Sequence, residues 1–360
     1  MSYYCLPADY EKRTLDAYSV LNDRYASDQI IETYGNILLP DIGSGRHASK
    51  LPKINLKELS KYIRHSHRRS IQFNYTLNAS CWGNLELQPR GVKRIIGFVA
   101  SLIDCGVDRF TIAVPSVIEL VKRHFLEQKV TASVIAQVDS INKVMAFKAL
   151  GCDRINLDEN MNRDFEFIEH ASREVDTELI VNFLCVNNCP FEQYHYNVNA
   201  HGTSTKDGAA KDDYIKLRCA MQQLGNPLER IKAGWIRPED VRSYASRGVK
   251  YFKIIGRKPI DYDLPRTVET YMKGNFRGNL QHLFECFSTP DDLGRVFYID
   301  NQALDGFLDY FIKNKPDCRS DCRGCRHCRS YARKALRTNK SLAKKCLDHC
   351  QRELVKLIGS

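Results

Sequence analysis

The residues best suited to chemistry lie in the segment 182–201, which reads NFLCVNNCPFEQYHYNVNAH. Within it, Cys185 and Cys189 stand four positions apart, directly after an apolar run of the kind that forms strands. Two thiols at this spacing can both bind one metal ion or cluster. His195 and His201 follow as candidate acid–base groups, because imidazole titrates near neutral pH. Each could equally be an ordinary hydrogen-bonded histidine.

Two other cysteines, Cys81 and Cys219, are predicted to join this pair. Cys81 follows a strand-like segment, and Cys219 lies in a helical stretch beyond the long loop 198–213. Four thiolates from separate segments can bind a 4Fe–4S cluster, and a structural zinc ion is also chemically feasible. The alternative is that Cys81 and Cys219 are small buried apolar residues, as free cysteines often are.

A second group of cysteines is closely spaced near the C-terminus, in the sequence CRSDCRGCRHC. Four thiols within so short a segment predict a bound zinc ion or Fe–S cluster. The first three also have the C-x₃-C-x₂-C spacing of radical S-adenosylmethionine enzymes. In that family the motif follows the first barrel strand, whereas here it lies beyond the last, so the context argues against this reading. The four predicted ligands are Cys318, Cys322, Cys325 and Cys328.

Composition indicates a globular protein of the cytoplasm. The chain has 360 residues, of which 43% are hydrophobic and 27% charged. It contains no apolar run of the roughly 20 residues that a membrane helix needs, so we expect no membrane contact. The N-terminal residues do not form a secretory signal. In a reducing compartment, the 14 cysteines are expected to bind metal rather than form disulfides.

The positive charge is concentrated in the C-terminal tail. The formal net charge is +11, and residues 313–360 contain 14 Lys and Arg against 4 Asp and Glu, which gives +10. Such a tail could bind RNA phosphates, an acidic carrier protein or an electron donor. A solvated basic face is the simpler explanation. Tyr331 is the only aromatic residue there that could stack on a base.

The elements that position these residues follow a repeating pattern. An amphipathic helix ends at a glycine, a short turn follows, and a buried strand begins. Glycine is expected at such helix ends because it adopts positive φ without strain. The three clearest helices are predicted at 92–105, 140–150 and 238–247, and they end at Gly106, Gly151 and Gly248.

About eight strands alternating with helices predict an α/β fold, namely a (β/α)₈ barrel. A doubly wound open sheet is the alternative, but no G-x-G-x-x-G motif follows an early strand. We expect an N-terminal segment at 1–28, the barrel at 29–312, and a small basic Cys-rich helical tail at 313–360. The strands are predicted at 29–34, 70–77, 107–112, 130–135, 152–157, 178–184, 230–235 and 249–254.

In such barrels the active site lies at the C-terminal ends of the strands. Asp164 is a candidate catalytic residue there, although it could simply stabilise a helix N-terminus. Arg257 is placed to hold a carboxylate or phosphate, or to form a structural ion pair. Asp158 and Glu159 follow another strand. The candidate substrate-binding residues are Arg46, Asn78, Asn162 and Arg163.

These residues together resemble the peptidase U32 family. The resemblance covers roughly residues 28–300. The cysteine-rich tail looks like an extension found in one branch of the family. The matching segments are IETYGNILLPDIGSGR, FNYTLNASCWGNLE, GCDRINLDENMNRDF, NFLCVNNCPFEQYHYNVNAH with the later Cys219, and IRPEDVRSYASRGVKYFKIIGR.

The resemblance implies an Fe–S protein that acts in oxygen-independent hydroxylation. Substrates of such relatives include ubiquinone precursors and nucleotides of RNA, with prephenate as the oxygen source in some. It also implies a 4Fe–4S cluster at the barrel mouth, bound by Cys185, Cys189 and Cys219 with Cys81 as a fourth ligand. The tail would hold a second Fe–S cluster or zinc. Alternatives are the peptidase of the family name and a non-catalytic module that binds RNA or a carrier protein.

Overall fold

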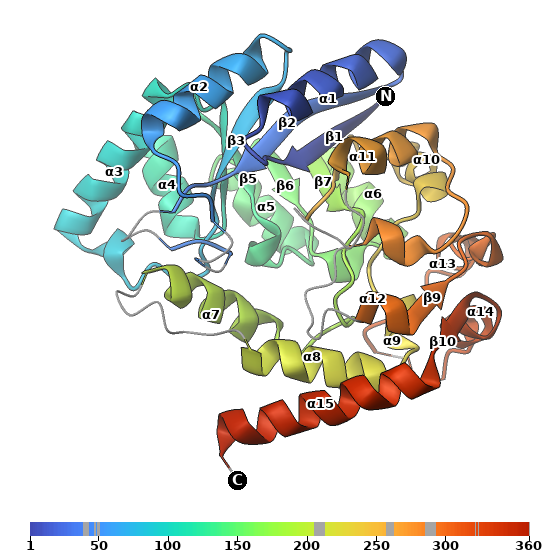
Figure 1. Cartoon of the computed structure of the whole chain (residues 1–360). Coiled ribbons are helices and arrows are strands. Elements are labelled where there is room, and N and C mark those ends of the chain that lie inside the picture. The colour runs from blue at the N-terminus through green and yellow to red at the C-terminus, as the bar shows by residue number, and fades with distance from the viewer. Residues whose placement is uncertain are drawn as a thin grey trace.

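Eight short parallel strands close on themselves to form a barrel, and helices surround it on the outside (Figure 1). Strand β1 pairs with both β2 and β8, which completes the closure. The predicted (β/α)₈ fold is therefore confirmed. The strands are β1 (Ser2–Pro7), β2 (Asp28–Gly35), β3 (Gln72–Leu77), β4 (Arg109–Ile112), β5 (Lys129–Ala132), β6 (Arg154–Asn156), β7 (Asp176–Ile180) and β8 (Tyr251–Lys253).

The outer helices bury one face each against the barrel, and the main hydrophobic core lies between them and the strands. They are α1 (Lys12–Arg24), α2 (Leu56–His67), α3 (Pro89–Asp104), α4 (Pro115–His124), α5 (Ile141–Ala149), α6 (Phe165–Glu174), α7 (Glu192–Ser204), α8 (Asp213–Gly225), α9 (Glu229–Lys232), α10 (Val241–Ala245) and α11 (Leu264–Lys273). This computed structural model describes residues 1–38, 43–46, 48, 51–204, 213–256, 263–284, 293–320, 322 and 324–359.

Two expectations about the strands are wrong. Residues 1–28 are not a segment outside the barrel, because they contain β1 and α1. The segment 230–235 is not a strand: it begins inside α9, and Arg230 is fully buried there against the ring of Phe297. The strand count was right only because one missed strand replaced one false strand.

The repeating helix–glycine–strand unit is confirmed in its backbone geometry. Gly106, Gly151 and Gly248 have φ of 99°, 95° and 96°, a region that favours glycine. In each case the glycine N–H and the next N–H donate to carbonyls of the last helical turn, as in a Schellman motif. This ending turns the chain from the outer helix directly into the next buried strand.

We expect Gly248→Ala to lower the free energy of unfolding by about 1–3 kcal/mol, since a side chain at this φ is strained. The added Cβ would also lie 3.0 Å from Cβ of Ser172. Urea denaturation measures the effect. Gly97→Ala is the control, because Gly97 lies exposed within α3 with open space around it. It should gain about 0.5–1 kcal/mol, and equal effects at both sites would contradict the argument.

The C-terminal region packs in two places. It contains α12 (Leu293–Val296), α13 (Asp309–Asn314), α14 (His327–Ala335), α15 (Lys340–Ile358) and the antiparallel strands β9 (Phe297–Ile299) and β10 (Leu336–Thr338). Helices α13 and α14 contribute residues to the main core, and α15 packs against helix α8. Cys346 and Cys350 of α15 are buried in an apolar cluster with Leu217 and Leu224 of α8. In Figure 1 the red helix α15 runs beneath the yellow helix α8.

No helix in the described part of the chain combines the length and apolar character that crossing a membrane requires.

Candidate active site at the barrel mouth

The segment that follows β7 is fixed at the C-terminal end of the barrel. Asn182 is fully buried there and joins this segment to the chain beyond β8. Its Nδ2 donates to the carbonyls of Ile255 and Leu283, and its Oδ1 accepts from the Ile255 N–H at 2.8 Å. A buried amide with these bonds holds the chain rigidly, and Cys185 follows three residues later.

Three of the predicted cysteines come together at this mouth. A hydrogen bond with Cys189, followed by burial and the nearby Cys219, raises the pKa of the Cys185 thiol well above its usual value. The same hydrogen bond lowers the pKa of Cys189 to about 7. Helix α8 supplies Cys219, whose Sγ accepts a hydrogen bond of 3.1 Å from Gln223 Nε2. The loop after β7 and α8 thus supply one group of thiols.

The fourth predicted thiol is not joined to them by any contact that the structure gives for the described residues. Cys81 lies in the loop after β3, and its Sγ accepts from the Gly83 N–H at 3.4 Å. The neighbouring Ser80 donates to Asn197 of α7, which draws this loop toward α7. The role of Cys81 as a ligand stays a prediction.

Three buried carboxyl groups lie beside the thiols: Asp158, Glu159 and Glu192, whose ligand oxygens lie within 4.8 Å of one another. Burial, then the charges of Glu192 and Asp158, raise the pKa of Glu159 well above its usual range. Glu159 also acts on Cys185 electrostatically. Tyr196 donates to Glu192 Oε1 at 3.2 Å. The Glu159 carboxyl group can hold or release a proton next to the thiols.

Asp158 should make stability depend on pH. Burial, then Glu192, raise the pKa of Asp158 to about 6 from 3.8. A carboxyl group whose folded pKa is raised favours folding most below pH 4, and this contribution is lost as pH rises toward 6. Asp158→Asn should therefore gain about 2–3 kcal/mol relative to the native chain between pH 4 and pH 7.5.

Urea denaturation at the two pH values measures this gain. The control is Asp176→Asn, because Asp176 is half-buried and pairs with Lys250 at 2.8 Å. If both variants change with pH equally, the buried carboxyl group is not the cause.

Two predicted substrate-binding residues lie together at the mouth. The Gly45 N–H donates to Asn78 Oδ1 at 3.3 Å, which holds the 43–46 loop over the end of β3. Arg46 extends its guanidinium to 5.8 Å from the ring centre of Tyr34. Lys253 Nζ lies 4.1 Å from the same ring centre. Tyr34 belongs to an apolar cluster against which Cys185 packs. Arg46 and Lys253 therefore lie against the same ring, and Lys253 also pairs with Glu178.

The side chains of Asn162 and Asp164 form hydrogen bonds with backbone groups instead of facing an open space. Asn162 is fully buried, and its Nδ2 donates to the carbonyls of Ile180 and Gly234. Asp164 caps α6 by accepting from the Phe167 N–H at 3.0 Å, which is the structural alternative considered for it. The structure gives both of them structural partners.

The side chain of Arg163 is likewise bound to backbone groups. Its guanidinium donates to the carbonyls of Ile231, Lys232 and Ala233. It also lies 4.7 Å from the ring centre of Phe307. It also acts electrostatically on Cys318 and Cys328. Its predicted contact with substrate stays a prediction.

His195 and His201 both lie on α7, with His195 half-buried and His201 exposed. Six residues of α-helix turn through 600°, so the two side chains project about 120° apart. They do not share one helix face and cannot act as a pair on one atom. Arg257 lies outside the described residues.

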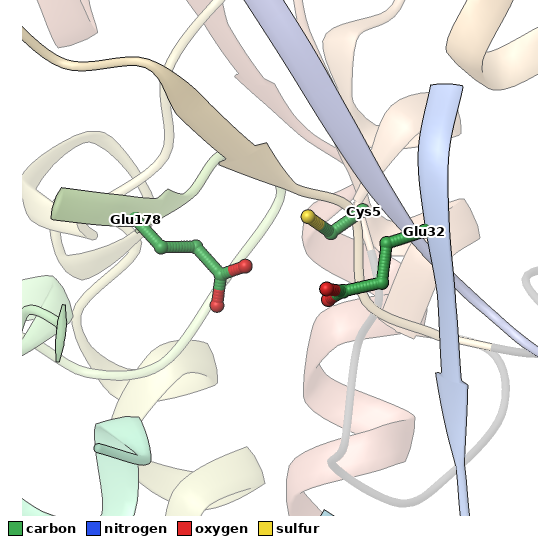
Figure 2. A group of neighbouring side chains, drawn as sticks. All are labelled: Cys5, Glu32 and Glu178. Atoms are coloured by element: carbon green, nitrogen blue, oxygen red, sulfur yellow. The ribbon is translucent and has the colours of Figure 1, made fainter. Parts of the chain in front are cut away.

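The barrel interior is charged. Figure 2 shows Cys5, Glu32 and Glu178, which project from β1, β2 and β7 toward one another. The Arg154 guanidinium lies 3.3 Å from Glu32 Oε2 and 3.4 Å from Glu178 Oε1. Lys253 is 3.4 Å from Glu178 Oε2. These cations already neutralise the carboxylates, so the group is an ion-pair network and not a vacant metal site.

The four tail cysteines line one cavity of about 360 Å³ between α9 and the segment that joins α13 to α14. Lys232 of α9 and Phe311 of α13 line it too. Cys322 interacts electrostatically with Lys232. Burial raises the pKa of Cys318 to about 11, and Arg163 opposes this increase. The sequence prediction that these four residues form one group agrees with the cavity.

Sequence reasoning missed three residues of the mouth: Glu192, Tyr34 and Lys253. Glu192 opens α7 and resembles any acidic residue at a helix N-terminus. Lys253 had a visible signal, because a lysine inside the buried run YFKII requires a partner.

The chain is similar to known proteins over most of its length. Residues 44–215 match the family model described as Peptidase family U32, a range that contains Cys81, Cys185 and Cys189. The Uncharacterized protease MJ1657 of Methanocaldococcus jannaschii is 33% identical over 299 residues, which cover 82% of this chain and 86% of that protein. The structure of the U32 peptidase Mk0906 shares the fold, with 19% identity, a TM-score of 0.54, and coverage of 72% of this chain and 94% of that one.

Proposed function

This chain is a member of peptidase family U32, and we propose that it is an Fe–S enzyme that hydroxylates an anionic substrate without molecular oxygen. The observation that carries the proposal is the convergence of Cys185, Cys189 and Cys219 at the barrel mouth. The mouth is where barrel enzymes place their chemistry. The substrate is a small molecule, a peptide or an RNA nucleotide.

The three thiols can be ligands of a four-iron cluster, in which each thiolate binds a different iron. Among the described residues, the three-residue groups whose ligand atoms all lie within 4.8 Å include none of this trio, so the three sulfur atoms do not already surround one point as the ligands of a single zinc ion do. The pKa of about 7 for Cys189 also makes its thiolate accessible at neutral pH.

The surrounding residues have separate roles. A bound cluster with three thiolate ligands would supply an iron that can bind a substrate or oxygen donor and exchange electrons. Arg46 attracts an anionic group to the mouth, and a prephenate-like dicarboxylate is a suitable oxygen donor. Glu159 and Glu192 exchange the proton that the reaction releases.

The electron balance requires a partner. Replacing a C–H bond by C–OH with oxygen at the level of hydroxide releases one proton and two electrons. The proton passes to the Glu159–Glu192 pair. The two electrons must leave for a one-electron acceptor, for which we propose an oxidised carrier protein.

Anaerobic purification tests the proposal. The protein should contain iron, acid-labile sulfide and a broad absorbance near about 400 nm. The Cys325→Ser/Cys328→Ser variant should keep the iron that belongs to the mouth. A strain without this chain should accumulate a metabolite or RNA nucleotide that lacks one oxygen atom. Iron-free protein that cleaves gelatin or a peptide library would overturn the proposal and favour the peptidase of the family name.

A further inference from the structure

We propose that Cys318, Cys322, Cys325 and Cys328 hold a second 4Fe–4S cluster, which passes single electrons between the barrel mouth and an acidic carrier protein. The cluster assignment stands on the tail itself. Its electron-transfer role rests on the proposed function of the mouth.

The spacing of the four thiols favours a cluster over zinc. They line a single cavity of about 360 Å³. Yet in the described part of the chain no three of their sulfur atoms are all within 4.8 Å of one another, whereas the sulfur atoms around one zinc ion are about 3.8 Å apart. Four thiols that surround a space without closing on each other suit the corners of a four-iron cluster.

Two cations compensate the negative charge of such a cluster. Lys232 lines the same cavity as Cys322 and interacts with it electrostatically. Arg163 acts on Cys318 and Cys328 and is fixed by three backbone carbonyls. Positive charge and hydrogen bonds to sulfur stabilise the reduced state of an Fe–S cluster. The tail site is therefore built to accept and release electrons.

The two cysteine sites are joined by short rigid segments. Glu159 acts on Cys185, and Arg163 acts on Cys318, so residues 159–163 reach both sites. The 3₁₀ helix in this segment covers Glu159–Met161. Helix α8 gives a second connection, because it carries Cys219, and Asn226, which lines the tail cavity, directly follows its last residue. These two connections place the sites on neighbouring elements.

The outer side of the tail site suits an acidic partner. Cys322 is exposed, as are Arg319, Arg326 and Arg329 around it. Exposed arginines attract an acidic protein and speed its encounter. Each cycle transfers one electron: the tail cluster is reduced from the mouth and then oxidised by the carrier. Two oxidised carriers are therefore consumed for each substrate hydroxylated.

Iron counting on the full-length protein separates the two sites. Anaerobically reconstituted native protein should contain about eight irons, and the Cys325→Ser/Cys328→Ser and Cys189→Ser variants about four each. After dithionite reduction, EPR of the native protein should show two interacting signals, and each variant should show one. The native spectrum gives this answer even if a variant fails to fold.

The tail cluster would be overturned if the native protein contained four irons and one zinc, and the tail variant kept the four irons but lost the zinc. Four irons that the tail variant loses would support the tail cluster but overturn the proposed function of the mouth. The two failures are therefore distinguishable.

A charge-reversal pair tests the partner. Arg319→Glu/Arg326→Glu should slow electron transfer to an acidic plant-type ferredoxin at least about tenfold at low salt, with no loss of iron. The matched control is Lys57→Glu/Lys61→Glu on α2, two exposed lysines far along the chain, which should leave the rate unchanged. Equal slowing in both variants, or RNA binding that the tail pair abolishes while electron transfer persists, would overturn the carrier assignment.

Discussion

Cys185→Ala is expected to lose about four irons per chain and all hydroxylating turnover, while the tail iron remains. Cys185 is the central thiol of the mouth, since it interacts with both Cys189 and Cys219. Removing it leaves two thiols from separate elements, too few to hold a cluster. Metal analysis and absorbance near about 400 nm measure the loss.

Cys152→Ala is the matched control. Cys152 is also buried, and burial raises its pKa to about 12, but it lies before β6 in the hydrophobic core. This variant should keep all its iron and lose only stability. Retention of the mouth iron in Cys185→Ala, or its loss in Cys152→Ala, would contradict the assignment.

Arg154→Met is expected to lower the free energy of unfolding by about 3–5 kcal/mol at pH 7.5. Arg154 is 2% exposed and lies between Glu32 and Glu178, which are fully buried. Without the guanidinium, both carboxylates remain in the barrel with too little positive charge. Urea denaturation measures the loss.

The loss should shrink in acid. Burial alone would raise the pKa of Glu178, but Lys253 and Arg154 lower it overall. A carboxyl group whose pKa is lowered by folding stabilises the fold at pH values above its unfolded pKa of about 4.5. This stabilisation is lost as the pH falls through the folded pKa. The difference between native and variant chains should therefore be largest at neutral pH. Arg24→Met, at an ion pair in which Arg24 is 57% exposed, should cost less than about 1 kcal/mol.

The sequence predicted the barrel because its repeating unit has a local physical signal. A helix that ends at glycine needs only neighbouring residues to define it, as Gly106 and Gly151 show. Strands of three to six residues buried on both faces show no alternation, so SYYCLP was missed and the run 230–235 was misread.

The candidate site was predicted in part for a similar reason. Cysteine spacing is visible in sequence, and it placed Cys185 and Cys189 correctly beside Cys219. The direction in which a polar side chain points is set by tertiary contacts. Asn162 and Arg163 follow a strand at the mouth, yet both are turned toward backbone carbonyls. The charged barrel interior was hidden because its members come from five strands, namely β1, β2, β6, β7 and β8.

The packing of α15 on α8 has a consequence for the order in which the protein matures. Strand β8, which closes the barrel onto β1, is synthesised only after residue 250. Helix α8 carries Cys219 and gains its apolar cover only when α15 has left the ribosome. The proposed cluster site is therefore completed only at the end of synthesis, because α15 runs to Ile358. We expect iron and sulfide to enter the full-length chain, and a chain stalled before residue 340 to remain unloaded.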